Sequence, residues 1–133
     1  MANTNKGTLG RLGEDIACDY LMGKRYRILA RNYKEKYGEI DVVAMAPDKT
    51  LIFVEVKTMM AGDAQKALAP EDQMSSAKSK KFRRIAQVLA AAHSELVRED
   101  KGWRLDLLAI LLNRKGTGEI DEKSYIVTHY ENI

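Results

Sequence analysis

The segment Leu51-Ile-Phe-Val-Glu-Val-Lys57 carries two charged side chains inside a run that otherwise has the composition of a buried strand. Because strand side chains alternate between faces, Glu55 and Lys57 point to one side, whereas their aliphatic neighbours point to the other. A same-face salt bridge near the strand end would explain the pair without any function. Glu-X-Lys also occurs often by chance, so its meaning depends on what lies near it.

A second acid, Asp41, lies within the apolar run Gly38-Glu-Ile-Asp-Val-Val43. If this run and the next form a hairpin around Pro47-Asp48, Asp41 and Glu55 lie near the same end of neighbouring strands. Two adjacent carboxylates repel, and one tends to become protonated unless a cation is shared between them. Mg²⁺ or Mn²⁺ would supply that cation, because these ions accept oxygen ligands and keep positions for water and a phosphate. The competing interpretation is that Asp41 is a turn or edge residue facing solvent.

A third acid, Glu14, lies on a predicted amphipathic helix. Advancing about 100° per residue places Glu14 beside Ala17 and Leu21, at the border of the apolar stripe. From there its carboxylate could approach the margin of the sheet, whereas Asp15 and Asp19 fall on the polar face. An exposed border position for Glu14 would need no function.

A lysine of the later helix also faces inward. Lys78 shares the helical-wheel face of Phe82 and Ile85, and a cation directed inward usually meets an anion. The anion would be the carboxylate cluster or a substrate phosphate. Equally, the lysine stem could cover apolar surface at the helix start while its charge reaches water.

The elements that must position these residues follow from hydrophobic periodicity and turn residues. We expect a helix over 8–22 ended by Gly23, strands over 26–33, 39–45 and 51–57, a loop over 59–72, a helix from 73 to about 98 broken by Lys101-Gly102, and strands over 105–112 and 125–129. The expected order is α-β-β-β-α-β-β. The segment 59–72 shows no clear period and contains both Gly and Pro, so we expect a flexible loop or lid there.

Length and composition point to one domain spanning residues 1–133, since 133 residues with 45% hydrophobic content can bury one ordinary core. The single cysteine, Cys18, excludes an internal disulfide and has no partner at zinc-ligand spacing, so it should be a small buried group. No apolar run approaches a membrane span, and the N-terminus lacks a signal-peptide core. We therefore expect a cytoplasmic location and no membrane.

The formal net charge of +3 is unevenly spread. Five cations without an intervening acid lie close together, Lys78, Lys80, Lys81, Arg83 and Arg84. A local basic patch of this kind suits an anionic partner such as nucleic acid, with Lys80, Lys81, Arg83 and Arg84 as the candidate contacts. Most charge runs are solvated helix faces, which is the competing interpretation.

Several motifs together resemble a known family. They are Gly13-Glu14, Arg31-Asn32-Tyr33, Gly38-Glu39-Ile40-Asp41 and Phe53-Val54-Glu55-Val56-Lys57-Thr58. In this order they resemble the YraN-like family of predicted endonucleases, which is similar to archaeal Holliday-junction resolvases of the PD-(D/E)XK nuclease group. The resemblance extends from about Gly7 to His129. One departure is Met59-Met60, which stands where such sequences usually carry an arginine.

The resemblance implies a restriction-endonuclease-like α/β fold, a mixed central sheet flanked by helices. It implies that Asp41 and Glu55 bind the Mg²⁺ or Mn²⁺ ion, with Glu14 as a further ligand. Lys57 would lie beside the attacked phosphate, and Lys78 matches a lysine at the start of the second long helix of the family.

Our leading hypothesis is a divalent-metal-dependent nuclease that acts on DNA, including branched DNA. The alternative is a non-catalytic nucleic-acid-binding module with a nuclease fold, and a third possibility is a structural or protein-interaction domain. A homodimer would follow by analogy, because junction resolvases cut two symmetric strands with paired sites.

Overall fold

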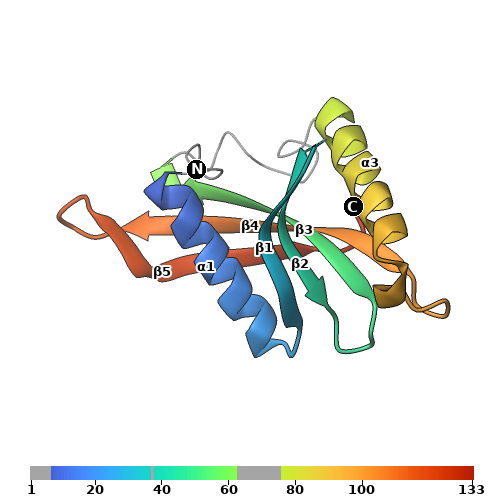
Figure 1. Cartoon of the computed structure of the whole chain (residues 1–133). Helices are drawn as coiled ribbons and strands as arrows, with labels where there is room; N and C mark the ends of the chain where they lie inside the picture. The colour runs from blue at the N-terminus through green and yellow to red at the C-terminus, as the bar shows by residue number, and fades with distance from the viewer. Residues whose placement is uncertain (1–6, 37, 63–75) are drawn as a thin grey trace.

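The computed structural model describes residues 7–36, 38–62 and 76–133, and within the last range it describes side chains from residue 80 onward. In chain order the elements are α1 (Thr8–Gly23), β1 (Arg27–Glu35), β2 (Gly38–Met45), β3 (Leu51–Met60), α3 (Ser76–Ala92), the short 3-10 helix η2 (Ser94–Leu96), β4 (Trp103–Arg114) and β5 (Ile120–Tyr130) (Figure 1). The predicted order α-β-β-β-α-β-β is confirmed.

The five strands form one sheet in the order β1-β2-β3-β4-β5. Neighbouring strands are antiparallel except β3 and β4, which are parallel from the Leu51–Trp103 pair to the Met60–Leu112 pair. A parallel pair needs a crossover connection, and the chain between β3 and β4 supplies it with α3. The fold is therefore the predicted α/β class with a mixed sheet between two helices.

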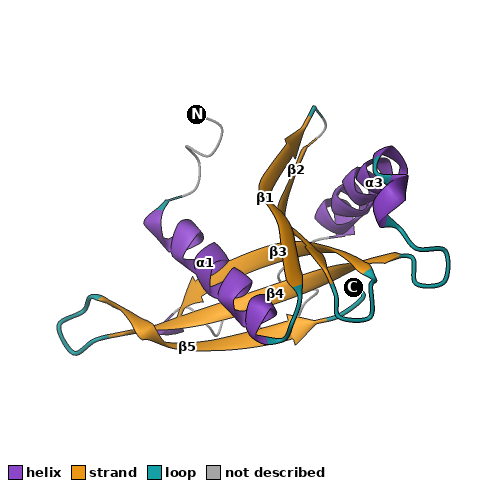
Figure 2. Ribbon diagram, turned by 60° about the horizontal axis from the view of Figure 1, so that its bottom comes forward, coloured by secondary structure: helices purple, strands orange, loops and turns teal. Residues whose placement is uncertain are grey.

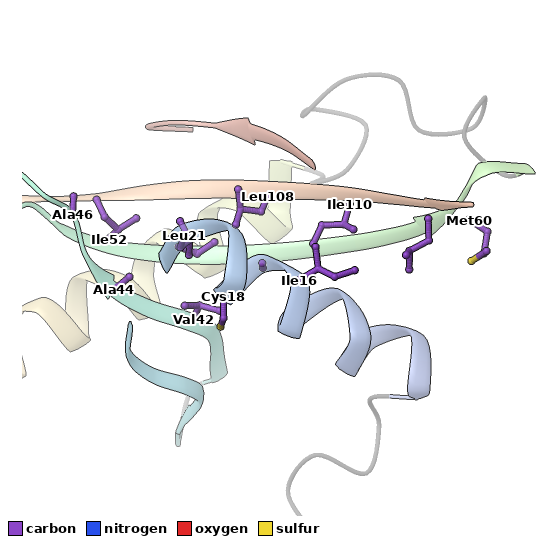
Figure 3. Close-up of a cluster of buried hydrophobic side chains, with 13 residues drawn as sticks. Ile16, Cys18, Leu21, Val42, Ala44, Ala46, Ile52, Met60, Leu108 and Ile110 are labelled. Atoms are coloured by element: carbon purple, nitrogen blue, oxygen red, sulfur yellow. The ribbon is translucent and has the colours of Figure 1, made fainter. Parts of the chain in front are cut away.

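Alternating strand residues divide the core into two layers. On one face, α1 buries Ile16, Ala17, Cys18 and Leu21 against Val42, Ala44, Ile52, Val54, Leu108 and Ile110 of the sheet (Figure 3). On the other, α3 buries Phe82, Ile85, Ala86 and Leu89 against Ile40, Val43, Phe53, Leu105 and Leu107. Cys18 is 4% exposed, as expected for a small buried group, and burial raises the pKa of its thiol.

The sheet forks between β2 and β3. These strands pair only from Met45–Leu51 to Val42–Val54, after which β2 continues with β1 and β3 continues with β4. Figure 2 shows the β1–β2 hairpin rising away from β3, β4 and β5 on the side of α3. A fork leaves the backbone of both strands without its usual partner at the branch point, so side chains must supply the polar contacts there.

Two glycines allow the close approaches that define the fork. A Cβ on Gly38, at the start of β2, would overlap Cδ1 of Ile85 in α3, and its φ of +153° also disfavours other residues. A Cβ on Gly13 of α1 would overlap the side chain of Thr58 in β3. The hairpin tip thus lies directly on α3, and α1 lies directly on β3.

Three predicted boundaries are wrong. The loop expected from Met59 begins later, because Met59 and Met60 still pair with β4. The second helix ends at Ala92 rather than near residue 98, because His93 leaves helical geometry (φ −123°, ψ +46°). Leu96 then packs against the α3-side core from η2.

The last strand also begins earlier than expected, at Ile120 rather than Tyr125. It is an edge strand in which every residue is at least partly exposed, so its hydrophobic alternation is weak in the sequence. Residues 63–72 of the expected loop and 73–75 of the expected helix lie outside the described residues. None of the helices in the described part of the chain has the length and apolar composition of a membrane span.

Candidate functional site

Asp41 and Glu55 meet at the fork of the sheet. Because the last β2–β3 pair is Val42–Val54, the next register position places Asp41 beside Glu55. Oδ2 of Asp41 accepts a hydrogen bond from the backbone N–H of Val56 at 2.8 Å, in place of a backbone partner from β2. The Asp41 side chain is 8% exposed, so this carboxylate is held in the branch point rather than facing solvent as a turn or edge residue would.

A pocket of about 280 Å³ opens beside the two carboxylates. Its lining consists of Gly38, Glu39 and Asp41 from β2, Glu55 from β3, and Lys81, Phe82 and Ile85 from α3. The acids therefore lie at the mouth formed between the hairpin and α3, with one lysine opposite. An open pocket of this composition can hold a hydrated cation and the phosphate of an extended ligand at the same place.

The other predicted site residues, Glu14, Lys57 and Lys78, are not among the described residues that line this pocket. Glu14 belongs to α1 on the opposite face of the sheet and is only 2% exposed. Lys57 is two residues beyond Glu55 on the same face of β3 and is half-buried. Lys78 lies near the start of α3, and its side chain is outside the described part of the structure.

The donor set at the fork suits a hard divalent cation. In the part of the chain that the structure describes, no group of three or more His, Cys, Asp and Glu residues gathers around a common point. At the fork the pocket is lined by the carboxylates of Asp41 and Glu55, with Glu39 nearby on β2, and its described lining contains no sulfur or imidazole ligand. Mg²⁺ is commonly held by one or two carboxylates, with waters and substrate phosphates completing its shell. The residues present therefore fit Mg²⁺ or Mn²⁺ rather than zinc.

The basic run of α3 divides into distinct positions. Lys81 lines the pocket with the carboxylates, whereas Lys80 and Arg84 are exposed on the outer surface of the helix. Arg83 donates a hydrogen bond to the backbone O of Ile133 at 2.6 Å, so its side chain is directed toward Ile133. Of the described side chains in this run, Lys81 is thus the one that lines the pocket, and Lys80 and Arg84 are exposed beside it.

A second polar cluster, on the α1 face, is separate from this pocket. Asp106 of β4 is fully buried and accepts hydrogen bonds from Arg104 Nε at 2.9 Å and His129 Nε2 at 2.7 Å. The backbone N–H of Asn132 donates a third, at 3.0 Å. Burial opposes ionisation of Asp106, but these hydrogen bonds and the Arg104 charge outweigh it and lower the pKa of the carboxyl.

This second cluster ties β4, β5 and the chain end together. Tyr20 of α1 extends it, since its hydroxyl lies 3.2 Å from Nδ1 of His129. Each polar group of Asp106 is matched by a donor within the fold, and the residue is inaccessible. We therefore assign the cluster to stability rather than to catalysis.

Sequence patterns alone did not identify Glu39 or Asn32 as neighbours of the acids. Lys81 was predicted only as a nucleic-acid contact. Its position four residues before the buried Ile85 places it on the side of α3 that faces the sheet, which is the sequence feature that could have indicated the pocket. For Asn32 the signal was its residue type, because asparagine tolerates the left-handed backbone that few residues adopt. Its φ is +50°.

The fold and the fork together define a class of protein, an α/β fold with a mixed sheet and two acidic residues where the sheet branches. A profile of "Uncharacterised protein family UPF0102" matches residues 13–110, and the chain belongs to this family. The result confirms the resemblance to the YraN-like family that the motifs indicated.

Relatives of similar length support the assignment. A "UPF0102 protein" of Mycobacterium ulcerans (strain Agy99) is 36% identical over 124 residues, covering 90% of this chain and 94% of the relative. One from Alkaliphilus oremlandii (strain OhILAs) is 33% identical over 124 residues, covering 93% and 95%. One from Chlorobium limicola (strain DSM 245 / NBRC 103803 / 6330) is 35% identical over 126 residues, covering 92% and 88%. Both chains align nearly end to end in each case.

Proposed function

We propose that this protein is a nuclease that uses Mg²⁺ or Mn²⁺ to hydrolyse phosphodiester bonds in DNA. The observation that carries the proposal is the placement of Asp41 and Glu55 side by side in one pocket that also holds Lys81. Two carboxylates that line one pocket tend to repel each other, and a divalent cation shared between them offsets that cost. The resemblance to junction resolvases makes branched DNA the first substrate to test.

The residues of the pocket have separable roles in this proposal. Asp41 and Glu55 hold the ion, and the hydrogen bond from Val56 fixes the Asp41 carboxylate in one orientation. When bound, the ion would supply positive charge to the phosphate and make an attacking water easier to deprotonate. Lys81 places an ammonium group where charge grows on the phosphate oxygens, a role that the family pattern gives to Lys57.

The outer surface of α3 would guide the substrate. Lys80 and Arg84 are exposed next to Lys81, so a nucleic-acid backbone lying along the helix would meet two cations before a phosphate enters the pocket. Such contacts attract any polyanion and select no base sequence. Specificity for branched DNA would then depend on the shape of the substrate rather than on bases.

A cleavage assay tests the proposal. Purified protein is incubated with linear, nicked and four-way-junction DNA and with RNA, in the presence of Mg²⁺, Mn²⁺ or EDTA. We expect metal-dependent cleavage that falls at least 100-fold in Asp41→Asn and in Glu55→Gln. Both replacements keep the side-chain size, and asparagine at 41 keeps an acceptor for the Val56 N–H, so the fold should survive.

Glu122→Gln is the matched control, because it also removes one carboxylate. Glu122 is exposed on β5, which two strands, β3 and β4, separate from β2 in the sheet. It should cleave as the wild type does. Cleavage that persists in EDTA, or that is equal in the wild type and Glu55→Gln, would exclude the metal-dependent mechanism.

A second candidate function is a nucleic-acid-binding module without cleavage. It is favoured by the exposed cations of α3 and by the absence of a three-ligand acidic group among the described residues. Salt-sensitive DNA binding that survives Asp41→Asn, with no cleavage of any substrate tested, would favour this module over the nuclease.

A further inference from the structure

Asn32 of β1 has two features that its position in a strand does not require. Its φ of +50° lies in the left-handed region, which strand residues with a side chain normally avoid. Its side-chain Oδ1 is buried and has no hydrogen-bond partner among the described residues. A buried carbonyl oxygen without a donor is unfavourable, so each such atom calls for an explanation.

The register places Asn32 in line with the two acids. The β1–β2 pairs on either side are Arg31–Val42 and Tyr33–Ile40, which sets Asn32 directly across from Asp41. Asp41 in turn is next to Glu55 across the fork. Opposite residues on paired strands lie about 5 Å apart at Cβ, which applies to Asn32 and Asp41 of the hairpin. Glu55 adjoins Asp41 across the fork, where Asp41 contacts the next residue of β3, Val56, and both acids line one pocket.

The same position is where both strands of the hairpin exchange faces. Arg31 reaches α1, through an ion pair of 2.7 Å with Asp15, whereas Tyr33 packs into the core beside α3. In a regular strand these two residues would share a face. The left-handed turn at Asn32 produces the exchange, and it directs the hairpin tip over α3.

We propose that the amide oxygen of Asn32 is a third oxygen donor to the ion site formed by Asp41 and Glu55. The inference rests on the proposed metal site and goes beyond it by naming a neutral oxygen from a third strand. An amide oxygen is a hard ligand of the kind that divalent cations accept. An ion, or a water in its shell, would supply the partner that Oδ1 lacks within the described fold.

Asparagine could instead serve only the backbone, because it is among the few residues that adopt a positive φ easily. Glycine separates these two roles. It adopts the same backbone more readily but has no side chain. Asn32→Gly should therefore keep the exchange of faces and remove only the oxygen, whereas Asn32→Asp keeps both the backbone preference and an oxygen donor.

The test is a titration of metal-free protein with Mn²⁺, followed by the electron paramagnetic resonance signal of the free ion. We expect the wild type to bind one Mn²⁺ and Asn32→Gly to bind it roughly 10-fold more weakly or worse, the effect typical of losing a supporting group at a metal site. Asn32→Asp should bind at least as tightly as the wild type. Melting temperatures measured without metal should agree within a few degrees, which shows that the fold is kept.

The outcomes of this titration separate the role of Asn32 from the existence of the metal site. Equal Mn²⁺ affinity in the wild type and a folded Asn32→Gly would overturn the role of Asn32 and leave the Asp41–Glu55 site standing. Failure of the wild type itself to bind Mn²⁺ would overturn the proposed site together with this inference. If Asn32→Gly fails to fold, Asn32→Asp decides, because weaker binding by that variant contradicts an oxygen-donor role.

Discussion

The carboxylate of Asp41 takes over the backbone hydrogen bond of Val56 at the point where the sheet branches, with Oδ2 and N 2.8 Å apart. Beyond the Val42–Val54 pair, β2 no longer offers a carbonyl to β3, so the side chain of Asp41 satisfies a donor that would otherwise be buried. One residue thus stabilises the fork and supplies a carboxylate to the pocket. These two roles can be separated by substitution.

We predict that Asp41→Ala is less stable than Asp41→Asn. Alanine leaves the N–H of Val56 without its acceptor, which costs about 1–3 kcal/mol, whereas asparagine keeps an acceptor of similar size. Urea denaturation of both variants, without divalent metal, measures the difference. Equal stabilities would show that the hydrogen bond contributes little to the fork.

Gly13 should not tolerate a side chain. A methyl group at this position would overlap Thr58 of β3, and moving α1 outward would open the buried layer beneath it, so we expect Gly13→Ala to destabilise the protein by roughly 1–3 kcal/mol. Gly23, at the end of the same helix, has open space around its Cβ direction. Gly23→Ala should therefore be neutral or slightly stabilising, and thermal unfolding of the pair provides the comparison.

The buried Asp106 cluster should make stability depend on acid pH. The pKa of Asp106 is lowered in the folded protein, against the ordinary Asp value of 3.8. The stabilisation from ionised Asp106 is therefore fully present at pH values above 3.8. It is lost as the pH falls below 3.8 toward the lower pKa of the folded state. Asp106→Asn should remove this part of the acid dependence and, by leaving Arg104 without its carboxylate, cost about 3 kcal/mol or more at pH 7.

Denaturation curves at several pH values between 7 and about 3 test this prediction. Asp19→Asn is the control, because Asp19 is exposed on α1. A stability profile for Asp106→Asn that runs parallel to the wild type would contradict the assignment of Asp106 to acid-dependent stability.

The exposed cations of α3 should govern nonspecific DNA binding. Replacing Lys80 and Arg84 by glutamine removes two candidate phosphate contacts, so the slope of log K against log salt should decrease in magnitude by about 1.8 for duplex DNA. The double variant Lys115→Gln/Lys123→Gln removes the same charge around the β4–β5 turn, which lies away from α3 (Figure 1). A salt slope reduced equally by both double variants would show that binding is not located on α3.

Local patterns in the sequence were sufficient for the elements and for part of the site. The two-residue period of β3 predicts that Glu55 and Val54 point to opposite faces of the sheet. Val54 is buried on the α1 face, as this period requires. The helical periods around Leu21 and Phe82 likewise locate the buried faces of α1 and α3. These features depend on residues that are close in the chain, so they can be predicted from the sequence.

The fork could not be predicted in the same way, because it depends on contacts between distant segments. The pairing of β2 with β3 ends at Val42 while the hairpin tip packs on α3, where Gly38 meets Ile85. Only this long-range contact brings Lys81 to the carboxylates. Sequence patterns indicated Lys78 as a cation directed inward, and its side chain lies outside the described residues. The position of Lys81 in the pocket depends on how α3 packs against the sheet, which periodicity does not determine.

The most direct test of the ion site is its location in a crystal soaked with Mn²⁺, determined from an anomalous difference map. We predict one strong peak in the fork, within bonding distance of a carboxylate oxygen of Asp41 and one of Glu55, and no such peak in Glu55→Gln crystals. A map with its Mn²⁺ peak elsewhere, or with none in the fork at saturating metal, would contradict the proposal that these acids form a metal centre.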